Sequence, residues 1–218
     1  METLFSTETQ TAMQFPASLT EIYKPKAIAD FVGLAKVKRI VQSFAANPRE
    51  ACLLFLGEPG CGKSSLARAL AAQINSEVHT VSSAKCNLET LDNLARVCQY
   101  VPFGGGWHVV VLEEGDCMSD AASKWLLSRL DGTAPLPRTI WIITANGTDR
   151  LEERLISRTL LIKFENYGAG AETVAFLEKI WNERAPKDAP RPDFKRLSSK
   201  NIRQAIQNLE LELMAVGA

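Results

Sequence analysis

Residues 57–64 read Gly57-Glu58-Pro59-Gly60-Cys61-Gly62-Lys63-Ser64, and this stretch decides the fold. It fits the phosphate-loop pattern G-x-x-x-x-G-K-[ST] at every fixed position, after an apolar run at residues 53–56 and before a helix-forming run at residues 65–70. Glycines let backbone N–H groups turn toward phosphate oxygens, and the start of a helix adds a favourable dipole. The alternative, a glycine-rich turn that only links a strand to a helix, is disfavoured because both flanking elements are present. The stretch therefore predicts a phosphate-binding loop, or P-loop.

Strand-like and helix-like segments alternate on both sides of this loop. The expected strands cover residues 51–56, 78–82, 108–112, 139–144 and 160–164. The expected helices cover residues 35–46, 64–74, 88–100, 120–130 and 151–157. Repeated βα units with right-handed crossovers form parallel sheets covered on both faces. The pattern predicts an α/β fold, a P-loop doubly wound parallel sheet of five strands.

The strand pattern ends near Tyr167, and two amphipathic helices are expected at residues 172–183 and 201–214. They predict a small C-terminal helical domain, whose size is marginal for folding on its own. We therefore divide the chain into a flexible N-terminal arm (residues 1–20), a P-loop nucleotide-binding domain (21–165) and the helical domain (166–218).

Composition limits the function classes. The 218 residues carry 25 basic and 25 acidic side chains, so the net charge is zero and bulk charge argues neither for nor against a nucleic-acid partner. Residues 1–16 lack the basic start and apolar core of a secretory signal, and no apolar run is long enough to cross a bilayer. We expect a cytoplasmic protein with no membrane partner.

Cysteines and histidines give no metal motif. The five cysteines, at positions 52, 61, 86, 98 and 117, form no C-x-x-C pair, and we expect them to be reduced and mostly in the core. His79 and His108 each lie in or beside an expected strand. A structural role is expected for both, in preference to metal ligation or acid–base chemistry.

Two adjacent acids follow the apolar run at residues 109–112. In a P-loop ATPase one carboxylate holds Mg²⁺ and the next orients the attacking water. We assign Glu113 to the metal, together with the Ser64 hydroxyl, and Glu114 to the water. An ordinary strand followed by a polar turn would give the same pattern, but its place after the P-loop favours function.

With these motifs in register, residues 19–213 resemble the AAA+ superfamily, and within it the clamp-loader type that includes the small subunits of replication factor C. Residues 21–26 and 30–33 look like the opening motif of that branch, which packs against adenine. The resemblance implies that Tyr23, Pro25, Val32 and Gly33 lie near the purine, and that ATP and Mg²⁺ are the cofactors.

The resemblance assigns three further residues. Asn146, in Ile143-Thr144-Ala145-Asn146, matches the first sensor, which helps to place the attacking water. Arg158 matches the arginine that reaches the γ-phosphate in a neighbouring subunit, which implies a homo- or hetero-oligomer with a composite ATP site. Arg203 matches the second sensor, on a helical lid formed by residues 166–218.

The implied nucleotide contacts include the whole P-loop. They are Tyr23, Pro25, Val32, Gly33, Gly57, Glu58, Pro59, Gly60, Cys61, Gly62, Lys63, Ser64, Ser65 and Arg203.

Some positions depart from the family pattern. Glu113 stands where Asp is usual, which predicts slow hydrolysis, and Thr159 replaces a cysteine after Arg158. The resemblance does not extend to a collar domain. Ser123, Leu127 and Ser128 stand where the family has a glutamine and basic residues that face DNA.

Three functional hypotheses follow. The first is an oligomeric, ATP-driven switch in DNA replication or recombination, acting on DNA or on a DNA-bound protein. The second is a nucleotide-responsive scaffold that hydrolyses ATP weakly, and the third is an AAA+ remodeller of protein partners without direct DNA contact. Salt-dependent DNA affinity separates the first from the third.

Overall fold

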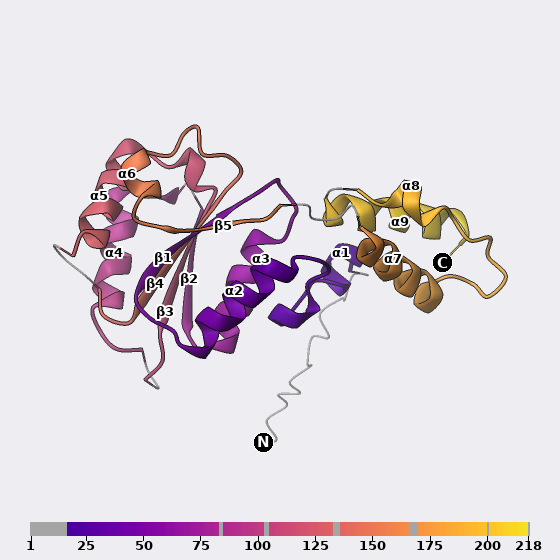
Figure 1. The fold of residues 1–218 in the computed structure, drawn as a ribbon, viewed down its shortest axis with the longest axis horizontal. Helices are drawn as coiled ribbons and strands as arrows, with labels where there is room; N and C mark the ends of the chain where they lie inside the picture. The colour runs from indigo at the N-terminus through magenta and orange to yellow at the C-terminus, as the bar shows by residue number, and fades with distance from the viewer. Residues whose placement is uncertain are drawn as a thin grey trace, which may run out of the picture.

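The computed structural model describes residues 17–82, 85–102, 105–132, 136–165, 170–199 and 201–217. Figure 1 shows a twisted sheet with helices on both faces and a second group of helices beside it. The strands are β1 (Ala51–Leu56), β2 (Glu77–Ser82), β3 (His108–Glu113), β4 (Thr139–Ala145) and β5 (Leu160–Lys163). They are paired in parallel in the order β2-β3-β4-β1-β5. The expected α/β fold with a five-stranded parallel sheet is confirmed.

The helices follow the expected order. They are α1 (Leu19–Ile22), α2 (Ala35–Ala46), α3 (Lys63–Gln73), α4 (Leu88–Cys98), α5 (Asp120–Leu130), α6 (Glu153–Ile156), α7 (Ala171–Arg184), α8 (Phe194–Leu197) and α9 (Ile202–Ala215). Two 3₁₀ turns, η1 (Ile28–Asp30) and η3 (Gly115–Cys117), were not expected, and neither were α1 and α8. Four residues are too few to show helical periodicity in sequence, so such elements escape pattern analysis.

The two faces of the sheet carry separate cores, because successive side chains of a strand point to opposite faces. On β3, Val109 and Val111 belong to the cluster that includes residues of α2 and α3. Val110 and Leu112 belong to the cluster under α4 and α5. Figure 1 shows these two helix layers on either side of the sheet. The central strands β1, β3 and β4 are buried on both faces, which explains their nearly continuous hydrophobic sequences, whereas the edge strands β2 and β5 are mostly exposed.

The C-terminal helices share a third cluster, built from α7, α8 and α9. The chain before the sheet joins it, because Leu19 of α1 is buried there and its backbone N–H donates to Glu210 of α9 at 2.9 Å. Residues 19 and 20, which the sequence analysis assigns to the arm, are therefore helical and packed. Residues 1–16 of the expected arm lie outside the described residues. The expected domain boundary between residues 165 and 166 falls at the edge of another segment outside them.

Across the part of the chain that the structure describes, no helix has the length and apolar character needed to span a membrane.

Candidate nucleotide-binding site

The P-loop joins the carboxyl end of β1 to the start of α3. Gly60 and Gly62 have φ angles of +78° and +93°, in the left-handed region that favours glycine. Gly62 is the N-cap of α3 and, as a glycine, it supplies no side-chain cap to this helix end. The N–H groups of the first turn are therefore not taken up by a capping side chain. This arrangement suits an anion such as phosphate.

Lys63 is buried and holds the loop to a neighbouring strand. Its ammonium donates to the carbonyl oxygens of Gly57 and Glu58 at 2.6 and 2.9 Å, and to Asn146 Oδ1 at 3.0 Å. Asn146 directly follows β4, which lies beside β1 in the sheet. The structure thus brings together the P-loop lysine and the expected first sensor, which lie 83 residues apart in sequence.

The pKa of Lys63 lies below its ordinary value, and burial is the main cause. Nearby Asp116 and Glu114 oppose this shift, while Arg203 adds to it. Arg203 is thus close enough to act electrostatically on the P-loop lysine. A phosphate placed beside Lys63 would favour its charged form and reverse the effect of burial.

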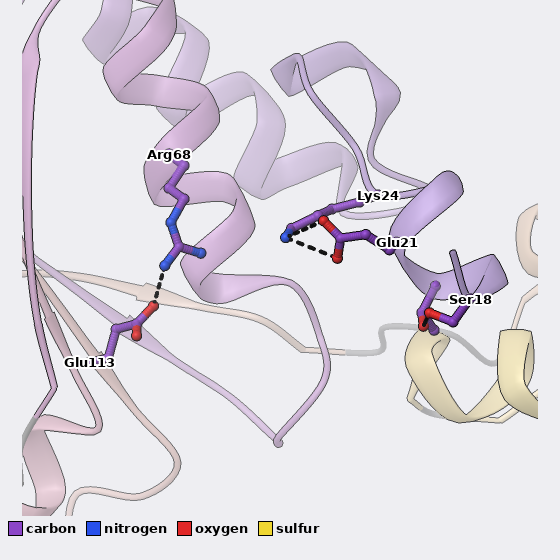
Figure 2. Close-up of polar contacts among 6 residues, drawn as sticks. Ser18, Glu21, Lys24, Arg68 and Glu113 are labelled. Atoms are coloured by element: carbon purple, nitrogen blue, oxygen red, sulfur yellow. Dashed lines mark hydrogen bonds and ion pairs between the residues drawn. The ribbon is translucent and has the colours of Figure 1, made fainter. Parts of the chain in front are cut away.

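The expected metal carboxylate has a cationic partner. Glu113 Oε1 lies 2.9 Å from Arg68 Nη2 of α3, and Figure 2 shows this ion pair between β3 and α3. Glu113 would have to leave or share Arg68 to ligate a cation. The half-buried Asp116 has one buried oxygen, Oδ1, without a hydrogen-bond partner among the described residues. It is a carboxylate that the sequence analysis did not select.

Glu114 lies at the sharp turn after β3. Its φ of +57° is unusual for a residue other than glycine, and its N–H donates to Thr144 Oγ1 at 3.2 Å. Thr144 is buried on β4, two residues before Asn146. The turn thus places the expected catalytic carboxylate beside the strand end that carries the sensor, with its side chain exposed.

A cavity of about 190 Å³ opens next to the P-loop. Gly60, Gly62 and Ser65 line it on the loop side, and Arg203 lines it from α9. The segment before α2 contributes most of the remaining wall, including Tyr23, Pro25 and Val32 of the expected adenine contacts. Gly33 is different, because it lines a second cavity of about 810 Å³ between α2 and β5.

Tyr23 connects the opening segment to the helical domain. Its hydroxyl donates to Glu183 Oε2 at 2.7 Å and accepts from Arg184 Nε at 3.2 Å, and its ring packs edge-on against Phe176. Burial raises the pKa of Tyr23 and the Arg184 hydrogen bond partly lowers it, so the phenol is neutral at physiological pH. On the same segment Lys24 pairs with Glu21 at 3.1 Å (Figure 2).

Sequence reasoning assigned no role to Asn201, which links the helical domain to the P-loop. Its Oδ1 caps α9 by accepting from the N–H groups of Arg203 and Gln204, and its Nδ2 donates to the Pro59 carbonyl at 2.8 Å. A Cβ at Gly60 would lie 2.3 Å from Asn201 Oδ1, so any larger residue there would displace the Asn201 side chain from these hydrogen bonds. An asparagine as the first residue of an expected helix was the available signal.

Arg158 lies apart from these groups. It follows α6, and its guanidinium is paired with Asp131 at the end of α5 and with the carbonyl oxygen of Arg154 at 2.8 Å. These partners belong to the α5–α6 side of the sheet, and the side chain is about one-third exposed (35%). The structure therefore does not bring Arg158 to the P-loop of its own chain.

Similarity to a known family covers the sheet and its site. The family described as "ATPase family associated with various cellular activities (AAA)" matches residues 53–165, just over half of the chain. The chain belongs to this family. The match runs from β1 through β5 and so contains the P-loop, the two glutamates and Asn146.

Curated AAA relatives are similar to most of the chain. Replication factor C small subunit 1 of Pyrobaculum aerophilum is 26% identical over 201 residues, covering 88% of this chain and 60% of the relative. Replication factor C subunit 3 of Saccharomyces cerevisiae is 25% identical over 168 residues, covering 73% of this chain and 49% of the relative. The chain thus spans about half to three-fifths of the length of these relatives.

Among solved structures, the chain is similar to the Thermotoga maritima RuvB Holliday junction branch migration motor. The TM-score is 0.70 at 18% identity, with coverage of 89% of this chain and 72% of the other. At this identity the likeness shows the fold alone. The similarity covers more of the chain than the family match at residues 53–165.

Proposed function

We propose that this chain is an ATP-binding and ATP-hydrolysing subunit of an oligomeric switch of the clamp-loader type, acting in DNA replication or recombination. The observation that carries the proposal is the convergence on one P-loop of Asn146 from β4, Arg203 from α9 and the Tyr23 segment. Similarity to replication factor C small subunits supports the replication role. RuvB, which shares the fold, is a Holliday junction branch migration motor, and this favours recombination as the wider setting.

The residues fit Mg²⁺-ATP, and each has a task in that reading. The N–H groups of the P-loop and Lys63 would hold the phosphates, and bound Mg²⁺ would neutralise charge on the β- and γ-phosphate oxygens. Ser64 and Glu113 would hold the cation. Glu114 would accept a proton from the attacking water, which Asn146 would help to orient.

The division of the chain into domains gives this site a means of control. Tyr23 and Asn201 tie the helical domain to both walls of the nucleotide cavity. The helical domain (residues 166–218) would close onto the nucleotide-binding domain (residues 21–165) as Arg203 reaches the phosphates. This closure would couple the nucleotide state to the conformation of the subunit.

The composite site depends on Arg158, which would approach a phosphate bound by a neighbouring subunit. Its exposed position away from its own P-loop supports action in trans, for which the side chain would have to leave its partner Asp131. An arginine supplied in this way stabilises charge that develops in phosphoryl transfer. A lone subunit should then hydrolyse ATP poorly.

A second candidate function is the weakly hydrolysing scaffold, and the ion pair between Glu113 and Arg68 favours it. In this arrangement the metal carboxylate is partnered by a cation of the same chain. Nucleotide could then be bound with little turnover.

Steady-state ATP hydrolysis as a function of protein concentration, with and without primed DNA, separates the two. The switch predicts turnover per subunit that rises with concentration, increases with DNA, and falls roughly 10³-fold or more in Arg158→Ala. Arg154→Ala is the matched control, because it removes a neighbouring exposed arginine and keeps the carbonyl that Arg158 uses. Tight Mg²⁺-ATP binding without turnover at any protein concentration would contradict the switch and support the scaffold function.

A further inference from the structure

Three potential metal ligands from three different elements meet at the opposite end of the sheet from the P-loop. They are His79 of β2, His108 at the start of β3 and Cys98 at the end of α4. Their ligand atoms, two ring nitrogens and the thiol sulfur, all lie within 4.8 Å of one another. We propose that these side chains form a binding site for a late first-row divalent cation, above all Zn²⁺.

The parallel register explains why these side chains converge. Glu77 is the partner of His108 and His79 is the partner of Val110, so Glu77, His79 and His108 share one face of the sheet. This is the face that α4 covers, and its last residue, Cys98, is fully buried against it. The two histidines lie on adjacent strands and the cysteine on the helix that covers them, so regular secondary structure holds all three ligands in place.

The hydrogen bonds of His108 direct a lone pair into the cluster. Its Nε2 lies 2.8 Å from the carbonyl oxygen of Tyr100, which can only accept, so Nε2 carries the proton. Nδ1 is then unprotonated and faces His79 Nε2 at 3.1 Å. A backbone carbonyl that fixes the tautomer in this way is the usual partner of a metal-ligating histidine.

The spacing fits tetrahedral coordination. Two nitrogens bound to Zn²⁺ at about 2.0–2.1 Å lie about 3.3–3.4 Å apart, close to the separation of the two ring nitrogens here. The Glu77 carboxylate is the candidate for a fourth ligand beside the two histidines, since its oxygens lie 3.8 Å from His79 Nε2 and 3.9 Å from His108 Nδ1. Thiolate with imidazole favours zinc or its late first-row neighbours over Mg²⁺ and Ca²⁺.

The surroundings of the cluster give a cation access from the surface and a structural role once it is bound. A cavity of about 360 Å³ lined by Glu77, Tyr100 and His108 leads to the cluster from the surface. Because β2 is the edge strand of the sheet in the described part of the chain, a shared cation would bind it to β3 and α4.

Cobalt titration of the full chain, after removal of metal by a chelator under reducing conditions, tests the site directly. We expect one equivalent of CoCl₂ to give tetrahedral d–d absorption with a thiolate-to-cobalt charge-transfer band, and ZnCl₂ to displace it. Cys98→Ala should abolish the charge-transfer band, and His79→Gln should weaken cobalt binding by more than roughly 10-fold. Cys52→Ala, which removes another buried cysteine, should leave the spectrum unchanged.

Thermal unfolding gives a second, independent measurement. Zinc at a free concentration about 100 times its Kd should raise the melting midpoint of the wild type by roughly 5–10 °C, and of His79→Gln by much less. His79 is partly exposed, and a glutamine amide can still hydrogen-bond to His108, so this variant retains the fold if Cys98→Ala does not. A charge-transfer band that survives in Cys98→Ala, or no tetrahedral cobalt signal in the wild type, would overturn the proposal.

Discussion

The two ends of β3 carry different groups of polar side chains. One group is evident from the sequence, and the other only from the tertiary structure. At the carboxyl end, Glu113 and Glu114 follow one another in sequence, next to a P-loop of eight consecutive residues. At the amino end, His108 joins His79 and Cys98, which come from two other elements. A site built from consecutive residues can be recognised in sequence, whereas a site assembled from separate elements needs the register of the sheet.

If the two ends are independent, variants at one end should not alter measurements at the other. The following predictions compare changes near the P-loop with Cys98→Ala, which should affect none of the nucleotide measurements.

The largest effect is expected for Glu114→Gln. Loss of the proposed general base should lower kcat roughly 10²- to 10⁴-fold while Mg²⁺-ATP affinity changes little, since the amide keeps the size of the side chain. Single-turnover hydrolysis together with equilibrium nucleotide binding measures both quantities. An unchanged kcat would assign the base to another carboxylate, for which Asp116 is the candidate.

Lys63→Ala should come next. It removes a buried cation whose charge-assisted bonds to phosphate contribute about 3 kcal/mol, so the Kd for ATP should rise roughly 100-fold. Fluorescent-nucleotide titration measures this change, and cobalt binding should stay at the wild-type level. A loss of both ATP binding and cobalt binding would show that the variant disrupts the whole sheet, and it would contradict the independence of the two ends.

The pH dependence of ATP affinity should report the environment of Lys63. Burial lowers its pKa in the free protein, so Lys63 is protonated below that pKa and loses its charge as pH rises through it. ATP affinity should therefore be constant at neutral pH and fall at alkaline pH, by up to about tenfold per unit, before an ordinary lysine titrates. Lys63→Arg is the control, because a guanidinium does not titrate in this range; an equal fall in this variant would assign the effect to another group.

The smallest effect is expected for Arg68→Gln. The ion pair with Glu113 is partly exposed and worth about 1 kcal/mol or less, so its removal should strengthen Mg²⁺ binding only a few-fold. Mg²⁺ dependence of ATP hydrolysis measures the shift. Arg39→Gln, on the exposed side of α2, serves as the charge-matched control. A weaker response to Mg²⁺ in Arg68→Gln would mean that Arg68 contacts nucleotide and does not restrain Glu113.

Much of the fold could be predicted from local patterns. The limits of β1, α2 and α5 match the expected ranges residue for residue, because strand-length apolar runs and amphipathic periods are local features. Tyr23, Pro25 and Val32 were expected near the nucleotide through the family resemblance, and all three line the cavity beside the P-loop. Gly33, assigned in the same way, lines another cavity, whose wall is formed by α2, β5 and the start of α7.

The sequence alone determined the P-loop, the order of βα units and the adjacent acids, because each depends on residues that are close in the chain. Only the tertiary structure decided that Asn201 meets Pro59, that Arg68 partners Glu113 and that His79, His108 and Cys98 converge. Those contacts depend on strand register and on how helices pack across a sheet. Both are set by the burial of the whole core and leave no short-range signal in the sequence.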